Sequence, residues 1–199
     1  MADMCFTFFI FILIPVRTLF AYNWLIMPIY LKRAFPTAVS DNFEFFSNLN
    51  PILIFFLAPL CAALTFKTKV HKIMIWGTLI MAAPTFLLGF GPITNIFLLY
   101  IVLMTIGEAL WSPRFMEYVS NIAPAGRVGA YMGIAMLPWF LTKMIAGTYT
   151  GTFLEKFCPE TGAQNTGTMW IIFAAFAMIS PILLIFTSKW LTSDKKASA

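Results

Sequence analysis

The feature that most constrains this chain is a series of six apolar runs, each about as long as a helix that crosses a membrane. A spanning α-helix needs about 20 mostly apolar residues. Proline and glycine punctuate the connections, and short connections make sequential helices antiparallel neighbours. We therefore predict a six-helix transmembrane bundle over residues 1–188. Its spans are residues 5–31, 50–66, 73–90, 96–122, 128–154 and 169–188, followed by a tail at 189–199.

The composition excludes a water-soluble fold. Of the 199 residues, 60% are hydrophobic and 11% are charged. Ordinary globular domains average roughly 25% charged residues. No aqueous fold has enough interior to hide this much apolar surface, so lipid must solvate much of it. The predicted fold class is an all-α membrane protein, and the lipid bilayer is its first partner.

Lysine and arginine lie mostly between the apolar runs, where they set topology. The net charge of +5 therefore indicates no nucleic-acid partner, because that would need a basic face on a soluble domain. One side of the predicted bundle carries Lys67, Lys69, Lys72, Arg127, Lys189, Lys195 and Lys196. The other side carries fewer bases, diluted by acids. This bias predicts a multi-pass protein with both termini in the cytoplasm, in a membrane that the sequence does not identify.

The sequence shows no motif typical of an enzyme active site or of a metal site. The three cysteines have no metal or redox spacing, and the lone His71 lies in a basic connection. No Gly-x-Ser-x-Gly or His-Glu-x-x-His motif occurs. We predict no enzyme activity, no cofactor and no metal site.

Five ionisable residues fall inside the predicted spans: Arg17, Glu108, Arg114, Glu117 and Lys143. A charge at mid-bilayer costs about 2.5–3.5 kcal/mol on insertion scales, so such residues face a cavity or a partner. Arg114 and Glu117 are three residues apart and are predicted to form a gating or structural ion pair. Glu108 has no local partner and shares a helix face with Ser112. Glu108 is thus a candidate to bind substrate or a proton, or to pair with Arg17 or Lys143.

The fifth span has a stripe at steps of four residues: Ala135, Trp139, Lys143, Gly147 and Gly151. The two glycines form a Gly-x-x-x-Gly pair that lets another backbone approach closely. Trp139 and Lys143 on one face would hold a ligand carboxylate beside an aromatic wall. Alternatively, Lys143 pairs with Glu108 and Trp139 only packs. Arg17 lies mid-way along a span broken by Pro15, which favours a cavity position for it.

Three motifs resemble the carboxy-terminal half of proton-dependent oligopeptide transporters, a family of the major facilitator superfamily. The run 48–54 (NLNPILI), with Ala58-Pro59-Leu60, resembles the eighth helix of that family. The run 107–113 (GEALWSP) resembles its tenth helix. Ala123-Pro124 followed by Tyr131-Met132-Gly133 resembles the connection from the tenth helix to the eleventh. The resemblance spans nearly the whole chain in order, as helices seven to twelve.

The resemblance implies roles for particular residues. Glu108 matches the glutamate that binds the peptide amino group, and Asn50, or else Asn48, matches an assisting asparagine. Ser112 matches the serine one turn after the glutamate. The pocket tryptophan of the eleventh helix would fall at Ala135, whereas Trp139 lies one turn later. Arg17, Arg114 and Lys143 match no family signature.

The resemblance also implies that the chain is one half of a transporter. The coupling motif of the first helix belongs to the amino-terminal half, and nothing like it occurs here. The superfamily fold uses two six-helix halves with the binding site between them. The implied partners are an amino-terminal half, in the same full-length chain or a second subunit, and a small-molecule substrate.

We therefore expect secondary active transport of a small polar solute by alternating access, coupled to protons through Glu108. A peptide or an amino-acid-like molecule fits that expectation, and Arg17 or Lys143 would tune the protonation of Glu108. Two alternatives remain. A non-transporting scaffold or assembly subunit would pair its intramembrane charges and leave no polar cavity. A membrane enzyme acting on a lipid-linked substrate would gather acids near one interface.

Overall fold

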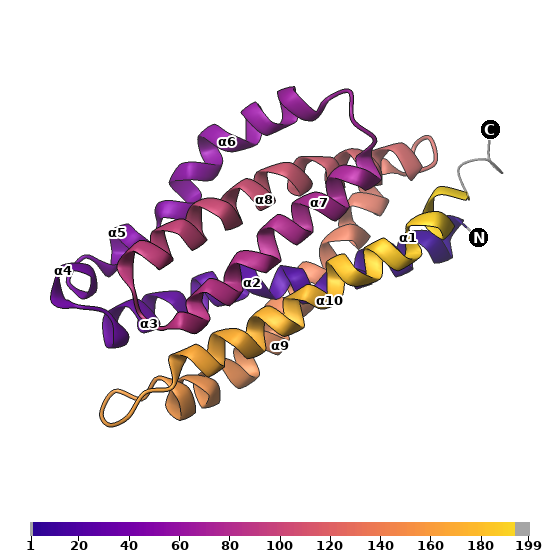
Figure 1. The fold of residues 1–199 in the computed structure, drawn as a ribbon. Helices are drawn as coiled ribbons and strands as arrows, with labels where there is room; N and C mark the ends of the chain where they lie inside the picture. The colour runs from indigo at the N-terminus through magenta and orange to yellow at the C-terminus, as the bar shows by residue number, and fades with distance from the viewer. Residues whose placement is uncertain (1, 194–199) are drawn as a thin grey trace.

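The computed structural model describes residues 2–193, with side chains described for residues 6–187. These residues form an elongated bundle of roughly parallel and antiparallel helices (Figure 1), and no strand occurs among them. The elements are α1 (Ala2–Ile12), α2 (Ile14–Leu25), α3 (Met27–Ala34), α4 (Thr37–Ser40), α5 (Phe43–Ser47), α6 (Leu49–Thr65), α7 (Val70–Ala82), the 3-10 helix η1 (Ala83–Phe90), α8 (Thr94–Ile122), α9 (Val128–Phe157) and α10 (Thr166–Ser193).

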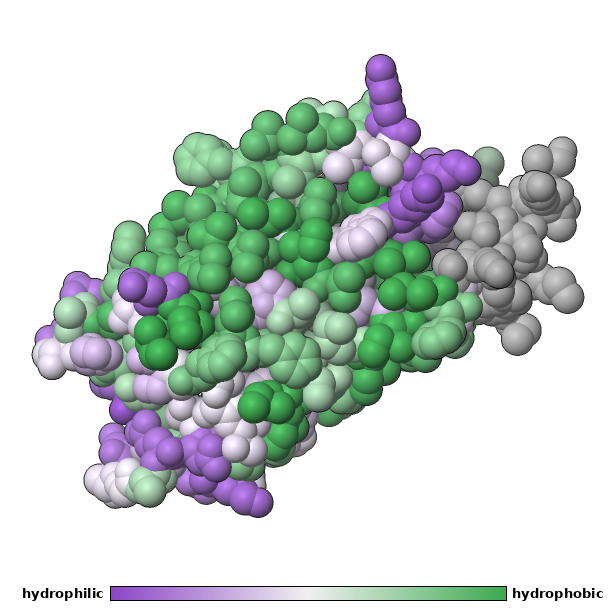
Figure 2. Space-filling model, viewed as in Figure 1, coloured by the Kyte–Doolittle hydropathy of each residue, from purple (hydrophilic) through white to green (hydrophobic). Residues whose placement is uncertain are grey.

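The predicted all-α membrane fold is confirmed. Within the described residues, five helices are long and apolar enough to cross a membrane, and α1 with α2 makes a sixth if this bent pair is one span. The five are Phe43–Thr65, Val70–Phe90, Thr94–Ile122, Val128–Phe157 and Thr166–Thr187. On the face shown in Figure 2, apolar residues cover most of the body of the bundle, and hydrophilic residues gather toward its two ends.

The first predicted span, residues 5–31, is three helices rather than one. Breaks fall at Leu13 and Ile26, each two residues before a proline, and α1 meets α2 at a bend of 40°. Proline has no N–H to donate and its ring clashes with the carbonyl of the preceding turn. Pro15 and Pro28 therefore begin α2 and α3 within their first two residues, where no intrahelical donor is needed.

The other predicted spans begin or end at different residues from the helices of the structure. The connection after residue 31 is helical, because α4 and α5 occupy it and α5 leads into α6. The third span ends as η1, and α9 continues to Phe157. The predicted tail begins inside α10, which runs to Ser193, and residues 194–199 lie outside the described part of the chain. The start of α1 and the end of α10 lie at the same end of the bundle (Figure 1).

Close packing of α7 on α8 sets the position of the middle of α8. A methyl group on Gly107 would stand 2.3 Å from the backbone nitrogen of Met81. A methyl group on Gly77 would stand 2.7 Å from the Cβ of Trp111. Small residues let two backbones meet in this way, which is how helices associate in lipid. By contrast, a methyl group on Gly147 or Gly151 meets no described atom of another segment within 4 Å, so the described residues do not make the predicted close approach at that pair.

Gly107→Ala should lower the free energy of unfolding by about 1–3 kcal/mol, the usual cost of overpacking a close contact. The contacted atoms belong to the backbone of α7, so no side chain can move aside. The measurement is the unfolding midpoint of the purified protein in detergent. Gly147→Ala is the matched control and should change stability by less than about 0.5 kcal/mol. Equal effects of the two variants would contradict the close contact.

Candidate functional site

A cavity of about 360 Å³ lies between four helices, α2, α6, α8 and α9. Five of the six residues predicted to bind substrate line it: Arg17, Asn50, Glu108, Ser112 and Trp139. Aromatic side chains form much of the remaining wall: Phe20, Trp24, Trp111 and Phe115. One buried cation, one carboxylate and an aromatic wall are the composition of a site for a small polar ligand.

Glu108 is held by an asparagine from another helix. The Nδ2 of Asn50, on α6, donates to Oε2 of Glu108, on α8, at 2.7 Å. The same nitrogen donates to Oγ1 of Thr105 at 3.0 Å. Both amide hydrogens of Asn50 are therefore used, and they join the start of α6 to the middle of α8. Asn48 is exposed and donates to the carbonyl of Glu44 instead, so the geometry favours Asn50 of the two predicted candidates.

Arg17 is a buried cation, and no described residue forms an ion pair with it. Its side chain lies on α2 and the residue is only 3% exposed. The guanidinium carbon stands 4.4 Å from the ring centre of Phe115 and 5.6 Å from that of Trp111. No described carboxylate lies within ion-pair distance of Arg17, and its Nε has no hydrogen-bond partner. Cation–π contacts offset part of the cost of burial, but an anion would offset more of it.

Lys143 lies outside the cavity. Its side chain is exposed, and its Nζ stands 4.7 Å from the ring centre of Trp139. No described carboxylate pairs with it, so the alternative in which Lys143 pairs with Glu108 finds no such contact. Trp139 itself faces the cavity and packs edge-on against Phe20, with ring centres 5.2 Å apart. Ala135, one turn earlier, is buried and does not line the cavity.

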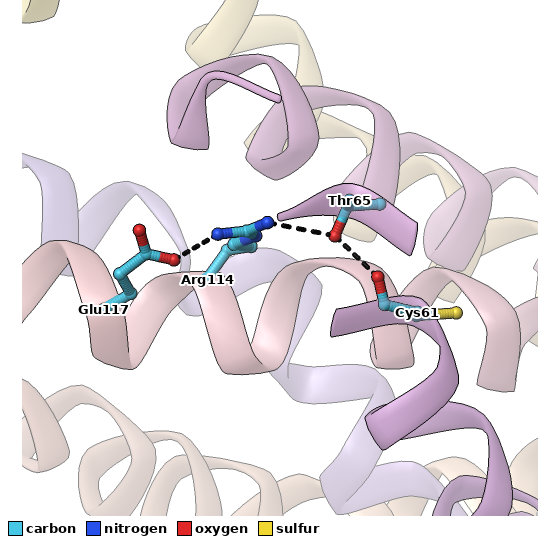
Figure 3. Close-up of polar contacts among 4 residues, drawn as sticks. All are labelled: Cys61, Thr65, Arg114 and Glu117. Carbon is cyan, nitrogen blue, oxygen red and sulfur yellow. Dashed lines mark hydrogen bonds and ion pairs between the residues drawn. The ribbon is translucent and has the colours of Figure 1, made fainter. Parts of the chain in front are cut away.

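Arg114 and Glu117 form the ion pair that their spacing predicts (Figure 3). Arg114 is 4% exposed, and a second guanidinium nitrogen donates to Oγ1 of Thr65 at 3.3 Å. Thr65 donates in turn to the carbonyl of Cys61 at 2.6 Å. This chain of contacts fastens the end of α6 to α8. Because Asn50 holds the start of α6, polar contacts attach both ends of α6 to α8.

Thr65→Val should loosen the end of α6, because valine keeps the shape of threonine but offers Arg114 no acceptor. Losing one such hydrogen bond costs about 1 kcal/mol, so the buried thiol of Cys61 should react with a maleimide roughly fivefold faster. Cys158, buried at the end of α9, is the internal reference, with Cys5 replaced by serine throughout. Thr148→Val is the matched control, since the Thr148 hydroxyl donates only within α9. An unchanged Cys61 rate would show that the contact does not hold α6.

The orientation of the aromatic wall depends on α7, which the sequence does not indicate. Trp111 lies over Gly77, and its Nε1 donates to Sδ of Met81, so α7 fixes its orientation. The signal available was Gly107, which immediately precedes Glu108 and allows α7 to approach.

No protein-family model matches the chain, and no curated protein matches it. No group of three or more potential metal ligands occurs in the part of the chain that the structure describes.

Proposed function

We propose that this chain is the carboxy-terminal six-helix half of a secondary transporter of the major facilitator type. In this proposal it moves a small polar solute, peptide-like or amino-acid-like, by alternating access coupled to protons. The supporting observation is the cavity, which holds a carboxylate, Glu108, and a buried Arg17 that pairs with no described acid, among aromatic side chains. A zwitterion complements that arrangement, with its carboxylate on Arg17 and its ammonium group on Glu108.

The exposed faces of the bundle support a second half. The cavity is open to one side, and of α6 only Cys61 is buried. In a two-half transporter the binding site lies at the interface between the halves. The faces of α2, α6, α8 and α9 that surround the cavity are therefore the proposed interface with an amino-terminal half, in the same chain or in a second subunit.

The scaffold alternative is less well supported. It requires the intramembrane charges to pair and the cavity to be apolar, whereas Arg17 has no ionic partner among the described residues and faces the cavity. The enzyme alternative requires a group of acids near one interface. Glu117 is instead paired with Arg114.

Proton coupling follows from the contact between α6 and α8. An ionised Glu108 accepts a charge-assisted hydrogen bond from Asn50, which is stronger than a bond to a neutral acid. Protonating Glu108 weakens this bond and so loosens the start of α6 on α8, while the contact of Arg114 with Thr65 still holds the end of α6. An ammonium group of the solute competes for the same carboxylate. Binding of a proton and binding of the solute therefore act on one side chain.

The test measures solute uptake by the full-length protein that contains these residues, reconstituted in liposomes. Radiolabelled dialanine is the probe, with an inwardly directed proton gradient as the driving force. The proposal expects accumulation above the external concentration that a protonophore collapses. Dialanine and a panel of free amino acids that all fail to accumulate would contradict it.

A further inference from the structure

The break between α1 and α2 is bridged by a side chain from the last helix. In an unbroken helix, the N–H of Val16 would donate to the carbonyl of Ile12, four residues earlier. The hydroxyl of Ser180, on α10, stands between these two groups. Its Oγ accepts the N–H of Val16 at 2.9 Å and donates to the carbonyl oxygen of Ile12 at 2.7 Å. Ser180 is fully buried, so one hydroxyl replaces one missing backbone hydrogen bond.

The bridge answers a requirement of the membrane. Pro15 breaks the helix, and α1 bends from α2 by 40°. Freed backbone groups at membrane depth have no water to bind, so neighbouring serine or threonine side chains satisfy them. Ser180 satisfies a donor and an acceptor with a single atom. The bend is therefore fixed by α10 as well as by the proline.

The residue after Val16 is Arg17, the cation of the cavity. Its side chain leaves the first turn of α2, the turn that the Ser180 bridge fixes. We propose that Ser180 is a positioning residue for Arg17, holding the first turn of α2 at the angle that aims the guanidinium into the cavity over Phe115. This inference rests on the proposed function for its consequence in transport, but the geometry that it asserts can be tested without transport.

Removing the hydroxyl leaves only one local way to satisfy both groups. In Ser180→Ala there are two outcomes. Either the N–H of Val16 donates directly to the carbonyl of Ile12, which straightens α1 on α2, or both groups stay unpaired in the protein interior. Either outcome reorients the first turn of α2 and moves Arg17 from its place against the ring of Phe115.

The first experiment measures the rate at which phenylglyoxal modifies Arg17 in the full protein in lipid nanodiscs, resolved by peptide mass spectrometry. Arg114 is the internal reference, because it is 4% exposed and Arg17 is 3% exposed. In Ser180→Ala we expect the ratio of the Arg17 rate to the Arg114 rate to rise about tenfold, as unpaired buried backbone groups open the turn. A general loosening of the fold would speed both arginines and leave the ratio unchanged.

Two further variants keep the result interpretable. Thr187→Ala removes a hydroxyl from the same helix that donates only to the carbonyl of Leu183, and it should leave the ratio unchanged. Ser180→Cys keeps a weak donor and acceptor in nearly the same volume and should give an intermediate ratio. If Ser180→Ala does not fold, the ratio of the two arginine rates in Ser180→Cys tests the inference instead. A ratio within twofold of the wild type in the folded serine variants would overturn the inference.

Transport gives the second measurement. With dialanine as the probe, Ser180→Ala should raise KM about tenfold and leave the maximal rate unchanged, because a mispositioned Arg17 weakens binding. Thr187→Ala should change neither. If the wild type fails to take up dialanine, the proposed function fails while the arginine ratio still decides the positioning role. If uptake is normal and both ratio and KM are unchanged in Ser180→Ala, the positioning role fails and the transport proposal stands.

Discussion

Glu108→Gln should abolish proton-driven accumulation of solute. Glutamine keeps the shape of the side chain and its oxygen still accepts from Asn50, but it neither titrates nor carries charge. Affinity for a solute with a free amino group should fall by about 30-fold or more, because removing one partner of a buried charge pair costs about 2–5 kcal/mol. The measurement is dialanine uptake in proteoliposomes with and without a proton gradient.

The matched control for this change is Glu117→Gln. Glu117 is an acid on the same helix that contacts Arg114 and does not line the cavity. It should retain gradient-driven accumulation within about fivefold of the wild type, since partly exposed ion pairs contribute up to about 1 kcal/mol. N-acetylated dialanine provides a second comparison, because it has no ammonium group for Glu108 to bind. Undiminished accumulation by Glu108→Gln would exclude Glu108 as the coupling residue.

Arg17→Met should lower solute affinity and raise stability at the same time. The methionine side chain keeps apolar contact with Phe115, and its introduction removes a buried cation that has no ionic partner in the described structure. Replacing buried charges by apolar residues is neutral or stabilising by about 1–4 kcal/mol. Binding of a carboxylate-bearing solute should weaken by roughly 30-fold or more for the same reason as in Glu108→Gln. The measurements are the melting temperature and the KM for dialanine.

Lys143→Met tests whether Lys143, like Arg17, contributes to binding of the solute. Lys143 is exposed and lies outside the cavity, so its loss should leave the KM within about twofold of the wild type. Dialanine amide, which lacks the carboxylate, should bind wild type and Arg17→Met about equally. A lower melting temperature with unchanged KM in Arg17→Met would show that Arg17 serves the fold rather than the ligand.

Some residues of the candidate site could be predicted from the cost of placing a charge in a membrane. A charge inside an apolar run is costly, and Glu108 and Arg17 both line the cavity, as that cost predicts. Helical spacing placed Trp139 and Lys143 on one stripe, but spacing gives only relative faces. The lysine stem reaches out of the bundle while the tryptophan ring turns inward. Side-chain direction within one stripe could not be predicted.

Long-range contacts could not be predicted either. The proline at position 15 predicted an interruption of the first span, and the bend is there. Nothing local to that proline indicates that Ser180, 164 residues from Val16 along the chain, completes the broken turn. The Gly77–Gly107 approach likewise depends on how α7 meets α8. The Gly-x-x-x-Gly pair of α9 instead has no close neighbour among the residues that the structure describes.

In the proposed function, the solute binds in the cavity between α2, α6, α8 and α9. The most direct test of this binding site is Ser112→Cys in a background without other cysteines, because Ser112 lines the cavity and is exposed. The rate of reaction with a small thiol reagent is measured with and without saturating dialanine. Bound dialanine should slow the reaction about tenfold or more, because a ligand in the cavity covers most of the site. An unchanged rate under conditions in which dialanine is transported would exclude this cavity and place the binding site elsewhere.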